Sequence, residues 1–144
     1  MIQSINRINM YPKVVSAPFA DFILLNEGLV HIKFTRSGQL ELEEAKEILR
    51  ITTQLAENAP HALIYDFNKM SVFFSQEVRA MAQNRNPISD NLFARAFVTY
   101  NLSNKLEVNH FIKYNKPTTP TTIFSSFDQA IRWIKEHQRH HAAS

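Results

Sequence analysis

Residues 42–66, LEEAKEILRITTQLAENAPHALIYD, decide the fold class of this chain. The first part repeats its inward-facing residues at helical spacing, which predicts an amphipathic helix. Those residues are Leu42, Ala45, Ile48, Leu49, Thr52, Leu55 and Ala56. Residues 58–61 break the helix, and residues 62–65 form a short apolar run typical of a buried strand in a parallel sheet. A helix that leads into such a strand indicates an α/β fold.

The residues before this helix predict a β-hairpin. Residues 19–26 and 29–35 are rich in Phe, Ile, Leu and Val, and the sequence NEG separates them. Alternation in the second arm predicts a core face formed by Val30, Ile32 and Phe34. His31 falls on the opposite face, so we expect it to be a surface residue of the strand. Residues 36–39 are expected to form a turn.

Residues 67–100 predict a loop, a helix and a strand. The loop FNKMSVFF occupies residues 67–74. Ser75 can cap a helix that stops before Pro87. Residues 93–100 form another apolar run, which predicts a second buried strand. Helices and strands therefore keep alternating after the first crossover.

Residues 101–144 predict a helix, a short strand and a closing helix. Ser103 can cap a helix that ends near residue 114. Its apolar residues are Leu106, Val108, Phe111 and Ile112. Residues 121–124 read as a strand, and Ser126 with Gln129 forms a capping box for the closing helix. The core stripe of that helix is Phe127, Ala130, Ile131 and Ile134.

These elements predict one α/β domain over residues 1–144, built on a single mixed sheet with an N-terminal hairpin followed by alternating helices and strands. We expect residues 1–12 to be poorly ordered or peripheral. Residues 138–144 are expected to form a frayed C-terminal tail.

The composition is that of an ordinary globular domain, with 44% hydrophobic and 20% charged residues and no cysteine. Residues 1–13 lack the continuous apolar stretch of a signal peptide or membrane span, so we expect a cytoplasmic protein. The net charge of +3 is small, and no nucleic-acid motif accompanies the basic residues Arg132, Lys135 and Arg139. We therefore expect neither nucleic-acid binding nor a membrane span.

The order of elements, the segment YDFNKM at residues 65–70 and the ending NKPTTPTTIFSSFDQAIRWIKEH resemble an uncharacterised family of small bacterial proteins. That family resembles the STAS (SpoIIAA-like) fold of anti-sigma-factor antagonists. The resemblance runs from about Phe19 to His137 and implies a non-catalytic regulatory domain. Its most specific part, from Phe124 to Trp133, specifies structure rather than chemistry.

The chain departs from the phosphorylation motif of those antagonists. The motif is an Asp-Ser-Ser-Gly-Leu run at the start of the helix that follows the central strand. Counted from Asp66 without gaps, its phosphorylated serine falls on Gln76 and its glycine on Glu77. A shift of one residue would make Ser75 the acceptor, but helix capping explains Ser75 better than phosphorylation does.

The residues do not form a known catalytic or cofactor motif. Only Gly28 and Gly38 are present, which excludes the usual glycine-rich nucleotide loops. No serine lies in a Gly-x-Ser-x-Gly elbow. His137 and His141 are four residues apart, but an exposed helix end explains them better than a metal site. We expect no catalytic residue, no cofactor, no metal and no enzymatic activity.

The best candidate for an interaction or ligand site follows the buried strand at residues 62–65. Its residues are Asp66, Asn68, Phe73, Phe74 and Ser75. Asp66 either accepts hydrogen bonds from amides in the following loop or contacts a ligand at the carboxyl end of the sheet. The apolar residues of the loop indicate core burial, a covered pocket or a partner patch. If they are exposed, a homodimer is the simplest outcome.

Three functions remain open from the sequence. The first is a regulatory or protein-interaction module whose partner binds beside the helix at Ser75. The second is a carrier of a small apolar ligand or lipid, which requires an apolar cavity. The third is an enzyme in which Asp66 and a histidine converge in a polar pocket.

Overall fold

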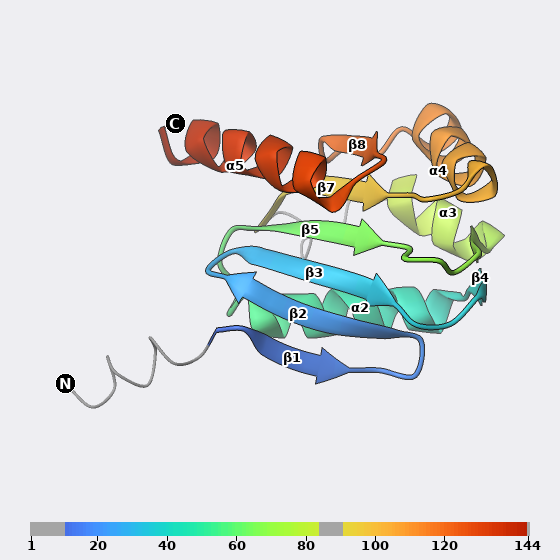
Figure 1. Cartoon of the computed structure of the whole chain (residues 1–144), viewed down its shortest axis with the longest axis horizontal. Helices are drawn as coiled ribbons and strands as arrows, with labels where there is room; N and C mark the ends of the chain where they lie inside the picture. Colours follow the sequence, from blue (N-terminus) through green and yellow to red (C-terminus); the bar gives the residue numbers. More distant parts are fainter. Residues whose placement is uncertain (1–10, 84–90, 144) are drawn as a thin grey trace.

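The computed structural model describes residues 11–83 and 91–143. These residues form a six-stranded sheet, a separate pair of short strands and four helices (Figure 1). The strands are β1 (Lys13–Ser16), β2 (Ala20–Asn26), β3 (Leu29–Phe34), β4 (Gly38–Leu40), β5 (His61–Asp66), β6 (Val72–Phe74), β7 (Leu92–Val98) and β8 (Thr121–Phe124). The helices are α2 (Leu42–Leu55), α3 (Gln76–Gln83), α4 (Leu102–Asn115) and α5 (Phe127–Ala143).

The main sheet has the strand order β1-β2-β3-β5-β7-β8. β1, β2 and β3 pair antiparallel, and β3, β5, β7 and β8 pair parallel. β3 therefore belongs both to the N-terminal hairpin and to the parallel half of the sheet. This arrangement confirms the predicted α/β fold with a mixed sheet, and the observed hairpin matches the predicted one. The prediction of a single sheet is wrong, because β4 and β6 form a second sheet.

Each face of the sheet has its own core. On the face covered by α2, the strands contribute large side chains such as Phe22, Phe34 and Leu63, all buried. On the opposite face α5 runs alongside the parallel strands (Figure 1). There β7 contributes Ala94 and Ala96, and these small residues let α5 approach closely. The α2 face consequently carries the larger core side chains.

Side-chain hydrogen bonds mark the first residues of the helices, and one helix begins at a different residue from the one predicted. The backbone N–H of Gln129 donates to Ser126 Oγ at 3.2 Å, which confirms the predicted cap of α5. The start predicted for α4 at Ser103 is wrong. Asn101 caps this helix, since its side-chain oxygen accepts a hydrogen bond from the N–H of Asn104 at 2.9 Å. Asn and Ser cap equally well, so residue type alone could not separate the two positions.

Three short strands were absent from the sequence prediction. β1 adds an outer strand to the hairpin. β4 and β6 form a parallel pair in which Gly38 lies opposite Val72, although a turn and a loop were predicted there. These two strands have three residues each and pair across more than thirty residues of sequence. Periodicity over three residues carries no usable signal.

The predictions for the chain ends had different outcomes. Residues 1–10 lie outside the described residues. The prediction that residues 1–12 are poorly ordered or peripheral can therefore be compared with the structure only at residues 11 and 12. Helix α5 continues to Ala143, so it includes most of residues 138–144, and their fraying stays a prediction. The predicted stop of the helix before Pro87 also falls in an undescribed range, 84–90, and α3 ends at Gln83.

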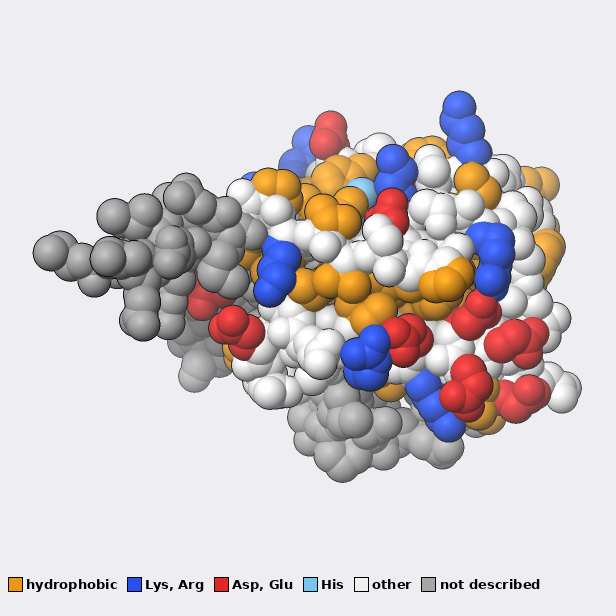
Figure 2. Space-filling view, turned by 90° about the horizontal axis from the view of Figure 1, so that it is seen from below, with side chains coloured by type: hydrophobic (Ala, Val, Ile, Leu, Met, Phe, Trp, Pro, Cys, Tyr) orange, Lys and Arg blue, Asp and Glu red, His pale blue; other side chains and the backbone are white. Residues whose placement is uncertain are grey.

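The edge of the sheet at β1 is partly apolar. Figure 2 views this edge and shows hydrophobic side chains in a band between charged groups. Val14 is 56% exposed, and Tyr11, just before β1, is also exposed. β1 has a strand neighbour on one side only among the described residues. This edge is one of two places where exposed apolar side chains gather.

Candidate functional site

Asp66 ends β5 and points to the α5 side of the sheet, where its oxygens already have partners. Oδ2 accepts a hydrogen bond from His31 Nε2 at 2.8 Å, and Oδ1 accepts one from the backbone N–H of Asn68 at 2.8 Å. The Tyr100 hydroxyl also interacts with this carboxylate. The amide contact confirms the interpretation that Asp66 binds the backbone of its following loop.

The charge state of Asp66 follows from these contacts. Burial raises the pKa of the Asp66 carboxyl, but the hydrogen bonds from His31 and from the Asn68 amide outweigh burial and lower it below its ordinary value. Burial and the nearby Asp66 charge raise the pKa of Tyr100. Asp66 therefore stays ionised near neutral pH, and its acceptor sites serve the fold.

The prediction that His31 is a surface residue is wrong. Only 13% of its side chain is exposed, and its ring packs on Phe127 with a centroid distance of 4.6 Å. The alternation in β3 was predicted correctly, since Val30 and Ile32 are buried on the α2 face. His31 is covered because α5 begins directly over its face of the sheet.

The five residues predicted as a candidate site do not form one. Asp66 lies on the α5 face, whereas Phe74 is buried in the core of the α2 face. Asn68 adopts a left-handed backbone with φ of 56°, and its N–H holds the turn to Asp66. Phe73 alone is exposed, at 43%. Most of the loop is core, as Phe67 and Val72 are fully buried, so the loop does not provide the exposed patch from which a homodimer was predicted.

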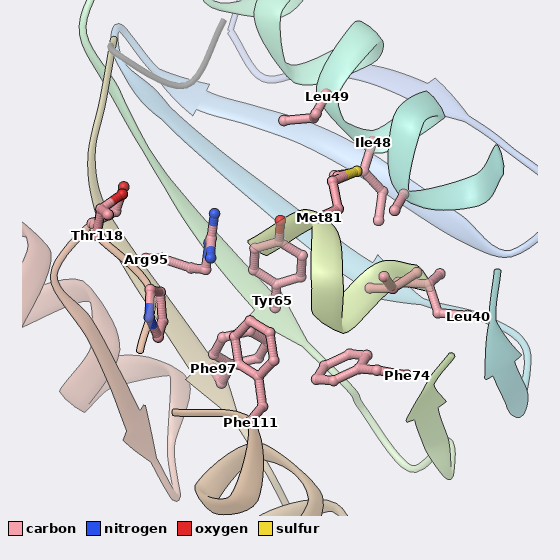
Figure 3. Close-up of a pocket in the computed structure, with 14 residues that line it drawn as sticks. Leu40, Ile48, Leu49, Tyr65, Phe74, Met81, Arg95, Phe97, Phe111 and Thr118 are labelled. Carbon is pink, nitrogen blue, oxygen red and sulfur yellow. The ribbon is translucent and has the colours of Figure 1, made fainter. Parts of the chain in front are cut away.

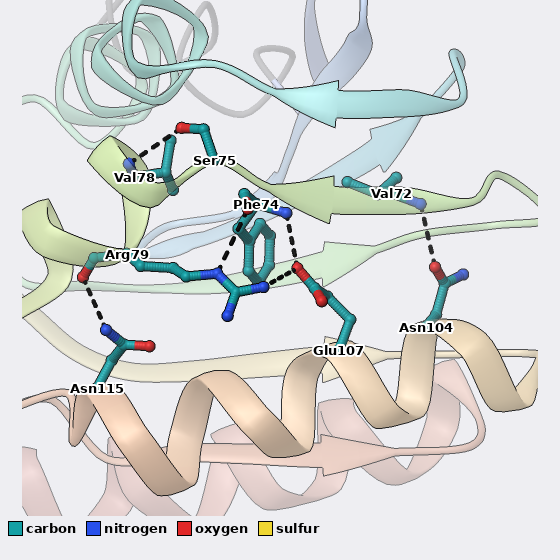
Figure 4. Close-up of polar contacts among 8 residues, drawn as sticks. All are labelled: Val72, Phe74, Ser75, Val78, Arg79, Asn104, Glu107 and Asn115. Atoms are coloured by element: carbon teal, nitrogen blue, oxygen red, sulfur yellow. Dashed lines mark hydrogen bonds and ion pairs between the residues drawn. The ribbon is translucent and has the colours of Figure 1, made fainter.

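Ser75 has a structural role. Its side chain is buried, and its Oγ accepts a hydrogen bond from the backbone N–H of Val78 at 3.2 Å, as the capping prediction requires (Figure 4). A phosphate on this oxygen would have to enter the core and displace the cap. The capping role therefore accounts for Ser75.

A set of polar contacts fastens β6 and α3 to α4 (Figure 4). Asn104 is fully buried, accepting from the N–H of Val72 at 3.1 Å and donating to the carbonyl oxygen of Met70 at 2.7 Å. Glu107 accepts from the N–H of Phe74 at 2.8 Å and pairs with Arg79 at 2.7 Å. Asn104 is satisfied by the backbone, and Glu107 by the backbone and Arg79, so both have structural roles.

A pocket lies on the α2 face, between the sheet and three helices (Figure 3). It has a volume of about 90 Å³ and is partly open to solvent. Its helical walls are formed by Ala45, Ile48 and Leu49 of α2, Val78 and Met81 of α3, and Phe111 of α4. Its floor is formed by Tyr65, Phe74, Arg95 and Phe97. The sequence did not predict this pocket, because its lining residues come from seven separate elements.

Two polar side chains lie at the floor of this pocket. Tyr65 stacks on Phe97 with a centroid distance of 4.8 Å, and the Arg95 guanidinium lies 5.8 Å from the Tyr65 ring. Burial raises the pKa of the Tyr65 phenol, and the neighbouring charge of Arg95 opposes this. The phenol is therefore protonated at neutral pH and available as a hydrogen-bond donor. The signal for Arg95 was visible in the sequence as a single charge inside the apolar run LFARAFV.

A wider groove lies at the carboxyl ends of β7 and β8. Tyr100, Lys105 and Arg132 line it together with polar residues of the two helix starts. It is more open to solvent than the pocket above Arg95. Among the described residues, no group of three His, Asp or Glu side chains could hold a metal ion. No helix in the same part of the chain is long and apolar enough to cross a membrane.

Comparison with known proteins places the chain in a family without assigning its activity. No curated protein and no solved structure matches it. Residues 23–138 match the model of a family described as a domain of unknown function (DUF7793), and the chain belongs to that family. The matched range includes every wall of the pocket.

Proposed function

We propose that this protein is a non-catalytic binding module that takes a small apolar ligand into the pocket between the sheet and α2, α3 and α4. The observation that carries the proposal is the pocket itself, an apolar space of about 90 Å³ that is open to solvent at one side. Interiors normally close around their side chains, so such a space on the core face indicates a ligand. Ser75 and Asp66, two residues of the site predicted from the sequence, both have structural roles. This favours a binding function over a catalytic one.

The proposal is tested with two neutral probes, hexan-1-ol and toluene, followed by amide NMR spectra of the full chain. We expect shift changes that cluster on Ile48, Met81 and Phe97. The variant Leu49→Trp fills the pocket mouth and should abolish them, whereas Leu106→Trp adds the same side chain outside the pocket and should not. Scattered shifts that persist in Leu49→Trp would overturn the proposal, and native mass spectrometry reports any ligand that co-purifies.

We also propose self-association as a second function, because exposed apolar side chains gather at α4. Four of the seven large hydrophobic residues that are exposed in the described part lie between residues 100 and 114. They are Tyr100, Leu102, Leu106 and Tyr114. Leu102 and Leu106 are one helical turn apart and share the outer face of α4. A second copy is the simplest occupant, since one two-fold axis would bury this face against itself.

The finer classification belongs to the same proposal. The N-terminal hairpin followed by alternating helices and strands supports a STAS-like, SpoIIAA-like fold. The bacterial origin is proposed from the sequence resemblance alone. A regulatory role is consistent with a ligand pocket whose wall includes α4, the helix that would contact the partner. A cytoplasmic location is supported by the absence of cysteine.

A further inference from the structure

The pocket is not uniformly apolar, and its polar end has an unusual donor. Arg95 lies on β7, between β5 and β8 in the sheet, and its side chain enters the α2 face. Its Nε is buried and has no hydrogen-bond partner among the described residues. A buried polar group without a partner is costly, and arginine is seldom placed on the covered face of an inner strand. The position of Arg95 therefore needs a reason.

The charge of Arg95 is also unbalanced within the described residues. The ion pairs of this part of the chain use other cations, and no carboxylate lies within ion-pair distance of its guanidinium. Among the described residues that line the pocket, Arg95 is the only charged one. Water can solvate such a group in an empty pocket, but an anion forms stronger, charge-assisted hydrogen bonds.

The neighbours of Arg95 are donors or apolar groups. The protonated Tyr65 phenol lies beside the guanidinium, and Thr118 is at the rim (Figure 3). A guanidinium presents parallel N–H groups that match the two oxygens of a carboxylate. One positive charge balances one negative charge, so a monocarboxylate fits better than a phosphate with nearly two charges.

The apolar part of the pocket sets the size of the ligand. A cavity of about 150 Å³ can hold benzene. A volume of about 90 Å³ is smaller, so it accepts a short aliphatic chain or part of one aromatic ring, and the rest can extend through the open side. Phe74, Phe97 and Phe111 provide aromatic surface for either group.

We propose that the pocket binds small hydrophobic monocarboxylates, such as a medium-chain fatty acid or an arylacetic acid, with the carboxylate on Arg95 and Tyr65. This inference rests on the proposed function, because it names the class of ligand for the same pocket. The carboxylate accepts from the Arg95 guanidinium and from the Tyr65 hydroxyl, and the apolar chain lies between α2 and α4.

The test compares acids with uncharged amides of the same shape. The pairs are hexanoate with hexanamide and phenylacetate with 2-phenylacetamide, each titrated by NMR into the full-length protein. We expect the acid to bind at least about tenfold more tightly than its amide, since hydrogen bonds between charged groups exceed neutral ones by roughly that factor. Arg95→Met should remove this preference while binding of the amide persists. Arg132→Met removes an equal charge from the open groove and should leave the preference unchanged.

The variants also separate this inference from a purely structural role. In Arg95→Met an apolar side chain of similar length replaces a half-buried arginine whose Nε has no partner among the described residues, so the variant should be as stable as the wild type or more stable. Arg95→Lys keeps the charge without the planar fork and should bind the acids with intermediate affinity. Equal binding of acid and amide, or a preference that survives in Arg95→Met, would overturn the inference and leave the proposed function standing. If neither acids, amides nor the neutral probes bind the pocket of the wild type, both proposals fail.

Discussion

At the scale of single residues, the contacts of Asp66 predict how stability depends on pH. The pKa of Asp66 is lower in the folded protein than its ordinary value of about 3.9. Ionised Asp66 therefore stabilises the fold fully above that value, and the contribution is lost as pH falls towards the folded pKa. We expect Asp66→Asn to lower the free energy of unfolding at pH 7 by about 2 kcal/mol, and the difference from wild type to shrink near pH 3.

Urea denaturation followed by circular dichroism, at pH 7, 5, 4 and 3, measures this difference. Asp21→Asn is the matched control, because it removes a carboxylate from β2 without touching the His31 and Asn68 contacts. Its difference from wild type should be small and should not follow the same pH dependence. A constant deficit for Asp66→Asn at every pH would mean that packing, and not charge, explains the role of Asp66.

Residue roles were predictable from sequence where they depend on neighbours in the chain. Ser75 caps its helix and Asp66 accepts from its own loop, and both contacts span two or three residues. His31 and Arg95 could not be placed in this way. The burial of His31 depends on α5, almost one hundred residues later, and the site of Arg95 depends on seven elements that meet only in the folded chain.

At the scale of elements, the start of α4 gives a prediction. Asn101→Ala removes the side chain that accepts from the Asn104 N–H, so it should lower the free energy of unfolding by about 1 kcal/mol. Ser103 lies inside the helix, and Ser103→Ala should be neutral or slightly stabilising because alanine favours helix. Thermal or urea denaturation of both variants measures the difference. If Ser103→Ala were instead the less stable of the two variants, the cap of α4 would be Ser103, as predicted from the sequence.

Long elements were predictable because their pattern repeats. The fourteen residues of α2 and the arms of the hairpin carry enough periodic positions to fix their type. β4 and β6 contain three residues each, and their stability comes from pairing with each other and from Asn104 and Glu107 on α4. Such contacts join distant parts of the chain, so a local pattern could not reveal them.

At the scale of the whole molecule, the two faces of the sheet have different roles. The α5 face is closed by small residues on β7 and by the His31, Asp66 and Phe127 contacts. The α2 face holds larger side chains and leaves the pocket open above Arg95. Helix α4 contributes Phe111 to the pocket and carries Leu102 and Leu106 on its exposed surface. A ligand that moves Phe111 could therefore alter the surface that contacts a second copy.

The exposed face of α4 predicts the oligomeric state. We expect wild type to be a dimer in native mass spectrometry and light scattering, and the double variant Leu102→Lys, Leu106→Lys to be monomeric because two charges cannot be buried there without partners. Neither residue lines the pocket, so the monomer should still bind hexanoate. Val14→Lys at the β1 edge is the control and should remain dimeric. If Val14→Lys gives the monomer instead, the dimer forms by pairing of β1 edges, because a charged side chain on an edge strand opposes that pairing. A monomeric wild type at micromolar concentration would rule out both surfaces as stable self-association sites.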